Sequence, residues 1–178
     1  MRDVKKSIND FQPGRYGYEQ ERKPKFPAVV NPYLARFGLE IKVLEEGGDV
    51  PDYVVVRRGD GKPVAYLEAE FALEGRWPTG QPFKYDTIRW PERKYERYRA
   101  SGGLYNGLPV FMITIRGGDL GDAYYIDART WISKAKKERV WGSIFWGVSK
   151  DDEDLGHGLE GLGKYIIDRI TSCSSSHL

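Results

Sequence analysis

Cysteine and histidine are scarce in this sequence. Its 178 residues include one cysteine, Cys173, and two histidines. A single cysteine excludes disulfide bonds within the chain and is typical of a reducing, intracellular compartment, so we expect a cytoplasmic protein. Structural zinc sites are built from four Cys and His ligands, and three such residues nearly exclude one.

Long hydrophobic runs and a large net charge are also missing. No run approaches the roughly 18 apolar residues of a membrane-spanning helix, and the first ten residues, MRDVKKSIND, lack the apolar segment of a signal peptide. We therefore expect no membrane partner. The formal net charge is +2, so basic character is confined to local patches. The length is sufficient for a sizeable core, and we expect one domain.

The clearest local pattern is a β-hairpin over residues 50–73. Two runs rich in Val, Tyr and Phe flank Asp60–Gly61, and an Asp-Gly pair between such runs predicts a tight hairpin turn. Pairing about this turn places Asp52 opposite a residue between Glu68 and Glu70. Odd positions of the second strand are apolar and face a core, so both glutamates leave the core-facing side. Three carboxylates are thereby predicted to lie in one small volume.

Carboxylates gathered in this way favour a bound divalent cation. Asp52 and Glu68 are our candidate ligands for Mg²⁺, with Mn²⁺ as a second suitable ion and the Ala69 carbonyl as a third ligand. The ion would activate a bound water and neutralise charge on a phosphate oxygen. Glu70 would orient the attacking water or hold a second cation. The alternative is an exposed strand face with two solvated glutamates, which is common in antiparallel sheets.

A basic helix is predicted after this hairpin. Pro91 and Glu92 are typical of a first turn, and Ser101–Gly102–Gly103 closes the helix. Its cations, and those just before it, would neutralise backbone phosphates of DNA. The candidate DNA-binding residues are Lys84, Arg89, Arg93, Lys94, Arg97 and Tyr98. The alternative is a solvated helix face with pairs between Glu and Arg side chains three or four residues apart.

Four aromatic residues accompany these cations. Trp77, Trp90, Tyr95 and Tyr98 would either stack on unpaired bases or pack in the core, and aromatics at helical spacing are more often core.

The remaining pattern predicts a mixed α/β fold. The expected elements are a helix at 28–37 ended by Gly38, a strand at 39–44, a loop at 74–86, a buried strand at 109–115 with a hairpin partner at 123–127, a basic helix at 129–138, an aromatic strand at 140–148 and a helix at 159–170. We expect a mixed central sheet with a three-stranded antiparallel meander and helices on both sides. The parts are a basic N-terminal arm (1–27), a core (28–128), a C-terminal extension (129–170) and a tail (171–178).

Residues 151–161 carry a weaker signal. Glycines at 156, 158 and 161 match a dinucleotide-binding spacing, but they follow an acidic stretch and no predicted strand. We therefore expect a glycine-rich loop in which His157 is solvated.

The motif residues resemble those of a known family. Pro51–Asp52, the hairpin and the E-x-E of Glu68–Glu70 resemble the active-site motif of the PD-(D/E)XK nuclease superfamily. The superfamily core of helix, three-stranded meander, helix and strand is similar to the order expected above. The stretch FKYDTIRWPERKYERY resembles small phage-type members. The resemblance covers about residues 28–128 and implies a restriction-endonuclease-like core and a Mg²⁺-dependent nuclease that cuts DNA phosphodiesters.

One position departs from the family pattern. The usual terminal lysine of the motif is missing: Glu70 stands at its position if Glu68 is the acidic member of the motif, and Ala72 does if Glu70 is. Some restriction endonucleases of the superfamily use E-x-E. Lys94 on the following helix is a candidate substitute for that lysine. Tyr98, one turn further on, is similar to the tyrosine of a polar-x-x-x-Tyr pair in exonuclease-like members.

Two other functions remain open from the sequence. The absent lysine also fits a catalytically inactive nuclease fold that binds DNA or a protein. A plain interaction domain would use the acidic face to meet a basic partner. The sequence leaves open whether cleavage is endo- or exonucleolytic, and a homodimer would be one way to cut both strands.

Overall fold

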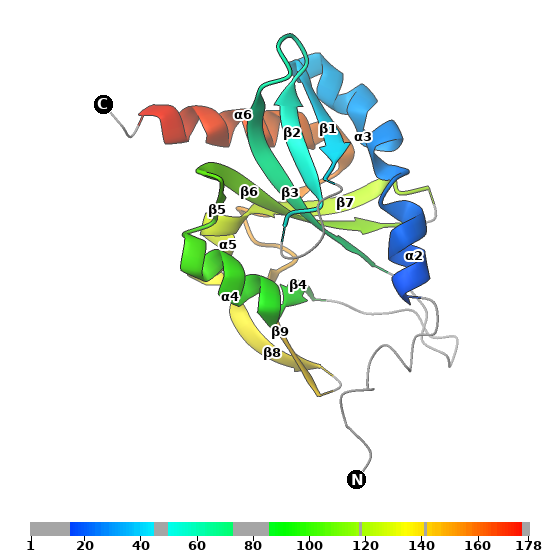
Figure 1. The fold of residues 1–178 in the computed structure, drawn as a ribbon. Helices are drawn as coiled ribbons and strands as arrows, with labels where there is room; N and C mark the ends of the chain where they lie inside the picture. Colours follow the sequence, from blue (N-terminus) through cyan, green and yellow to red (C-terminus); the bar gives the residue numbers. More distant parts are fainter. Residues whose placement is uncertain (1–14, 45–49, 73–85, 118, 141, 176–178) are drawn as a thin grey trace.

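The computed structural model describes residues 15–44, 50–72, 86–117, 119–140 and 142–175 (Figure 1). The larger sheet has the strand order β1-β2-β3-β6-β7-β10, with β5 paired to the start of β6. These strands are β1 (Leu39–Val43), β2 (Tyr53–Arg57), β3 (Pro63–Phe71), β5 (Leu104–Tyr105), β6 (Leu108–Arg116), β7 (Asp122–Asp127) and β10 (Gly156–His157). A smaller sheet has the order β4-β9-β8, formed by β4 (Thr87–Pro91), β8 (Lys136–Val140) and β9 (Ser143–Ser149).

Helices cover both faces of the larger sheet. They are α2 (Arg15–Arg22), α3 (Phe26–Leu34), α4 (Glu92–Ser101), α5 (Ala128–Lys134) and α6 (Leu159–Ser175), with a 3₁₀ turn at Ala35–Phe37. The predicted mixed α/β architecture is therefore confirmed, including the antiparallel meander β1-β2-β3. β3 and β6 are parallel, and β6 and β7 form an antiparallel hairpin.

The register of the β2–β3 hairpin agrees with the sequence pattern. Tyr53 pairs with Leu67, and the Asp52 N–H donates to the Leu67 carbonyl oxygen at 3.0 Å. Asp52 therefore lies at the level of Glu68. The turn itself differs from the expected tight one. Five residues connect Arg57 at the end of β2 to Pro63 at the start of β3, and the strand register shifts after Val55.

Each face of the larger sheet packs against its own hydrophobic cluster. The odd residues of β3 join residues of α3 and α6, among them Phe26 and Leu162, which are fully buried. The other face packs against α4, α5 and the smaller sheet through an aromatic cluster that includes Trp90 and Trp131 (Figure 1). Glu68 points to this second side, yet only 3 % of it is exposed. A sheet face covered in this way excludes the alternative of two solvated glutamates.

Several boundaries differ from the sequence expectations. Arg89 and Trp90 lie on β4, which was not predicted, and β8 replaces the second half of the helix expected at 129–138. The last helix continues to Ser175. The expected C-terminal extension is not separate from the core, because β9 pairs with β4 and β10 pairs with β7. Part of the expected arm is helical as α2, and Phe26 belongs to the core.

Some expectations concern residues outside the described parts of the chain. Lys84, Trp77 and most of the loop expected at 74–86 are among them, as are residues 1–14 of the N-terminal arm. Within the described residues, no helix combines the length and apolar character needed to cross a membrane.

The outer edge of the meander is closed by a side chain of α3. β1 is the first strand of the sheet, so alternate backbone groups point away from β2. At Ile41 these groups meet the Asn31 amide, whose Nδ2 donates to the Ile41 carbonyl oxygen at 3.2 Å and whose Oδ1 accepts from the Ile41 N–H at 2.8 Å. The amide thus replaces the strand that would otherwise pair here.

Replacing Asn31 with leucine tests this edge contact. The substitution removes both hydrogen bonds at nearly constant volume, so we expect the free energy of unfolding to fall by about 1–2 kcal/mol. Urea denaturation followed by tryptophan fluorescence measures the change. An unchanged midpoint in Asn31→Leu would show that water satisfies Ile41 equally well.

Candidate active site

Asp52 is held between β3 and the N-terminal segment. The Ala69 N–H donates to Asp52 Oδ2 at 2.8 Å, and Lys23 Nζ lies 3.0 Å from Asp52 Oδ1. The Tyr53 hydroxyl donates to the Lys23 carbonyl oxygen at 2.7 Å, which fixes the backbone that carries this lysine. One carboxylate oxygen is thereby oriented by the sheet backbone and the other by a cation from outside the sheet.

The Lys94 ammonium group lies at the centre of the cluster formed by Asp52, Glu68, Glu70 and Lys94. Its Nζ is 3.0 Å from Glu68 Oε1, 2.9 Å from the Ala69 carbonyl oxygen and 3.2 Å from Glu70 Oε2. Only 5 % of Lys94 is exposed. Lys94 is therefore buried and paired, which contradicts the alternative of a solvated cation on the helix surface.

Neighbouring charges keep this buried lysine protonated. Burial alone would lower the pKa of Lys94, but the negative charges of Glu70, Glu68 and Asp52 outweigh it and hold the pKa above its ordinary value. The influence of Asp52 shows that all three carboxylates act on one ammonium group. Lys94 is thus charged throughout the neutral pH range.

Helix α4 supplies three contacts to Glu68 from one face. Residues three and four apart on a helix are neighbours, which places Lys94, Arg97 and Tyr98 together. The Tyr98 hydroxyl donates to Glu68 Oε2 at 2.5 Å, and Arg97 Nη1 lies 3.4 Å from the same oxygen. Burial, followed by the charge of Glu68, raises the pKa of Tyr98 above its ordinary value. Tyr98 consequently stays protonated and acts as a fixed hydrogen-bond donor.

The structure brings together most of the predicted site residues. Asp52, Glu68, Glu70 and Lys94 converge, and the Ala69 carbonyl faces the same ammonium group. Three carboxylates are matched by three cations, since Lys23 and Arg97 complete the set with Lys94. Lys23 belongs to the segment expected as a basic arm, and its spacing in the sequence carries no signal of this contact.

Other predicted residues lie elsewhere. Arg89 Nη1 is 3.2 Å from Glu138 Oε2 on β8, and the Arg89 guanidinium lies over the Phe145 ring. Arg93 is exposed on α4. Of the aromatics proposed for base stacking, those described belong to the core: Trp90, Tyr95 and Tyr98 are 0 %, 8 % and 1 % exposed. The packing in the core that their helical spacing favoured is confirmed for these three, and base stacking is not.

The donor atoms of the cluster suit a hard cation. Carboxylate and carbonyl oxygens are the ligands that Mg²⁺ prefers, and here three of them already surround a positive charge. Among the described residues, no three carboxylate, imidazole or thiol groups form a metal site on their own. The oxygens near Lys94 are therefore chemically suitable ligands for a divalent ion. Such an ion would have to displace the ammonium group from them.

No protein-family model matches the sequence, and no curated protein is significantly similar to it.

The Lys94–Glu68 pair predicts a large effect on stability. Lys94→Met removes the charge at similar length and leaves Glu68 buried without its ammonium partner, so we expect a loss of about 3–5 kcal/mol in the free energy of unfolding. The double variant Lys94→Met/Glu68→Gln should recover a large part of it. Lys164 forms an exposed pair with Asp168, and Lys164→Met is the control, with an expected change below about 1 kcal/mol. Equal losses in the two lysine variants would contradict this account.

The raised pKa values predict alkaline destabilisation. Lys94 and Tyr98 keep their protons to higher pH in the folded protein than in the unfolded chain. The contribution of these two groups to the free energy of unfolding is complete below about pH 10. It is lost as the pH rises toward their folded pKa values, by about 1.4 kcal/mol per pH unit for each group. Tyr98→Phe should therefore show a smaller decline in stability between about pH 10 and 12 than the original protein, measured by urea denaturation. An equal decline in the stability of Tyr98→Phe and of the original protein would contradict the raised pKa of Tyr98.

Proposed function

We propose that the protein is a metal-dependent deoxyribonuclease with a restriction-endonuclease-like core, which hydrolyses phosphodiester bonds of DNA as an endonuclease. The observation that carries the proposal is the convergence of Asp52, Glu68, Glu70 and Lys94 beside the parallel strands β3 and β6. The site joins the residue just before β2, the carboxyl-terminal half of β3 and helix α4. The resemblance to PD-(D/E)XK nucleases implies the same arrangement.

The cation site would use oxygen atoms that this group of residues already brings together. Asp52, Glu68 and the Ala69 carbonyl would hold Mg²⁺ or Mn²⁺, with Glu70 adjacent to them. A bound ion would supply a water of lowered pKa and neutralise charge on the attacked phosphate. Lys94 Nζ would then leave Glu68 Oε1 and the Ala69 carbonyl. Its side chain would turn its charge toward the phosphate.

The other residues of the cluster orient these groups. The Ala69 N–H fixes Asp52 Oδ2, and Tyr98 with Arg97 fixes Glu68 Oε2. The second oxygens, Asp52 Oδ1 and Glu68 Oε1, contact Lys23 and Lys94, and both lysines would give up these contacts when an ion binds. Glu70, 12 % of whose side chain is exposed, is the candidate to orient the water or accept its proton. Lys94 takes the part of the lysine missing from the motif.

A specific observation also favours the inactive alternative. The three carboxylates are already neutralised by Lys23, Lys94 and Arg97, so the cluster is stable without an added ion. A nuclease fold kept for binding alone would have this property. It would bind DNA with equal affinity in Mg²⁺ and in chelator and would yield no product with any metal.

Plasmid cleavage separates these functions. Supercoiled plasmid and labelled single strands are incubated with the full chain in Mg²⁺, Mn²⁺ or chelator. We expect metal-dependent nicking, and a decrease of about 100-fold or more in Asp52→Asn, which keeps an acceptor for the Ala69 N–H but loses the charge. Asp168→Asn, which changes an exposed carboxylate on α6, is the matched control and should cut normally.

Three other outcomes would redirect the proposal. Cleavage retained in Asp52→Asn would remove this site from the reaction. DNA binding without cleavage in any metal would establish the inactive module. Direct conversion of plasmid to the linear form would point to two copies acting together, as in a homodimer, whereas successive nicking would point to one.

A further inference from the structure

This inference rests on the proposed function and concerns the sheet face next to the carboxylates. Glu70 pairs with Thr114 on the parallel strand β6, Thr114 pairs with Tyr124 on β7, and Tyr124 pairs with His157 on β10. Paired residues of a sheet point to the same face. The four residues therefore form one row across the face that also carries Glu68, and we call them the cross-strand row.

Thr114 has a polar group without a partner. Only 7 % of the residue is exposed, and its Oγ1 has no hydrogen-bond partner among the residues that the structure describes. The buried indole N–H groups of Trp90 and Trp146 share this property, but both lie within the aromatic cluster. Thr114 differs from them because it stands directly beside Glu70. A buried hydroxyl without a partner calls for an explanation, and a bound molecule that accepts its proton is one.

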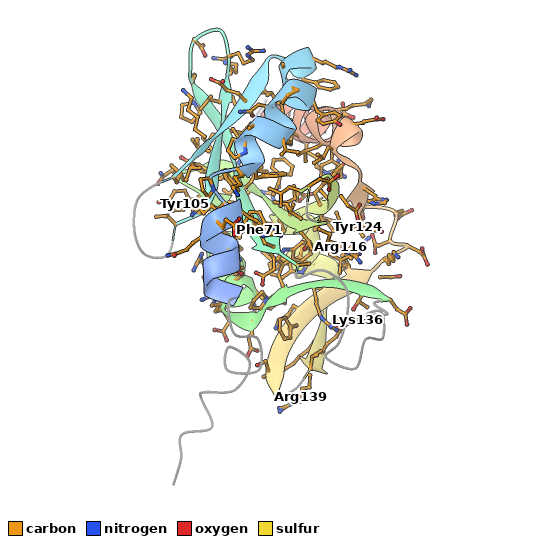
Figure 2. The ribbon with its side chains drawn as sticks, turned by 90° about the vertical axis from the view of Figure 1, so that its right-hand side faces the viewer. Phe71, Tyr105, Arg116, Tyr124, Lys136 and Arg139 are labelled. Carbon is orange, nitrogen blue, oxygen red and sulfur yellow. The ribbon has the colours of Figure 1, made fainter. Side chains whose placement is uncertain are left out.

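Arg116 adds a cation to the same face. It lies two residues beyond Thr114 on β6, so the two side chains point the same way. Its guanidinium carbon is 5.9 Å from the centre of the Tyr124 ring, and Figure 2 shows these two side chains next to each other. Asp122 is the cross-strand partner of Arg116, but its carboxylate is 2.7 Å from His157 Nε2. Arg116 forms no ion pair within the described parts of the chain.

The aromatic residues of the row support this cation. Tyr124 is 6 % exposed and stacks on the His157 ring at 4.0 Å with an angle of 4° between the planes. The stack, together with the contact between His157 and Asp122, limits the positions that the Tyr124 ring can take. Arg116 therefore lies over a fixed surface, which favours a defined guanidinium position.

We propose that Thr114 and Arg116 form a subsite for a DNA backbone phosphate next to the phosphate that is cleaved. A guanidinium group and a hydroxyl are suitable donors to two phosphate oxygens. Neighbouring strands of a sheet lie about 4.8 Å apart, so the subsite is within one or two nucleotides of Glu70. The substrate strand would run from β3 toward β7 past the carboxyl-terminal ends of β3 and β6, at the margin of the face that α4, α5 and the smaller sheet cover.

Phosphate neutralisation along a DNA strand tests the subsite. Fluorescein-labelled DNA carries one uncharged methylphosphonate at successive positions, and anisotropy with the full chain in chelator measures binding. We expect one position near the cleavage point at which neutralisation weakens binding about 10-fold. Arg116→Met should weaken binding of ordinary DNA by a similar factor, and methylphosphonate at that position should then have no further effect. Equal losses at every position would contradict the proposal.

Matched variants separate charge from geometry. Arg139 is an exposed arginine on β8, far from Arg116 in Figure 2, and Arg139→Met should leave the position-specific effect intact. Arg116→Lys keeps the charge and should restore part of the affinity, while Thr114→Val should weaken binding about 3-fold. In cleavage, Arg116→Met should raise KM and leave kcat nearly unchanged. Circular dichroism verifies the folding of each variant.

The outcomes distinguish this inference from the proposed function. If the original protein cuts DNA and Arg116→Met behaves like Arg139→Met, the subsite is wrong and the nuclease stands. If the protein binds DNA with the position-specific effect but never cuts, the subsite stands and the nuclease is wrong. If it neither binds nor cuts DNA, both are wrong.

Discussion

The buried contact of the Lys94 ammonium with Glu68, Ala69 and Glu70 is the interaction on which this site depends. Carboxylates so close together would repel one another, and a glutamate as buried as Glu68 is costly without a partner. One cation from α4 offsets both effects. It also fixes the helix to β3, because the contact includes a backbone oxygen of the strand as well as two side chains.

The topology explains why a helix residue reaches this point. Parallel strands cannot be joined by a short turn, so the chain between β3 and β6 must cross over a face of the sheet. Helix α4 lies in that crossover, and its buried face carries Lys94 and Tyr98. The same crossover leaves the carboxyl-terminal ends of β3 and β6 side by side. Functional groups of the cluster and of the cross-strand row therefore meet at one place.

This contact has a consequence for the proposed reaction. Two of the oxygens that would hold a divalent ion, Glu68 Oε1 and the Ala69 carbonyl oxygen, contact Lys94 Nζ, so ion and ammonium compete for them. Release of Lys94 would at the same time provide a cation for the phosphate. In the proposed nuclease, metal binding and positioning of the lysine are therefore one linked event, whereas in an inactive module the lysine stays in place.

Local patterns were sufficient to predict the centre of the fold. The period-two alternation of β3 and the Asp-Gly turn signal located Asp52 near Glu68, because strand register follows from side-chain alternation. Proline and glycine signals likewise bounded α4, which ends at Gly102 with φ 67°. These features depend on residues close in sequence, and the predicted strand register and helix end were confirmed, although the turn is longer than expected.

Features made by distant residues could not be predicted in this way. The smaller sheet pairs β4 with β9, more than fifty residues away, and β8 is too polar to show a strand period. The contact of Lys23 with Asp52 depends on where α2 and α3 are placed, which no spacing reveals. Thr114 stands within an apolar run, and its unpartnered hydroxyl becomes visible only once its neighbours are known.

Binding of Mn²⁺ measured by electron paramagnetic resonance tests most directly whether the oxygens around Lys94 form a cation site. Titration of the full chain should show bound Mn²⁺ at millimolar concentrations or below, lost in Asp52→Asn and retained in Asp168→Asn. Lys94→Met should bind the ion at least as tightly as the original protein, because the competing ammonium group is gone. Absence of bound Mn²⁺ in the original protein, or equal binding in Asp52→Asn, would contradict the account.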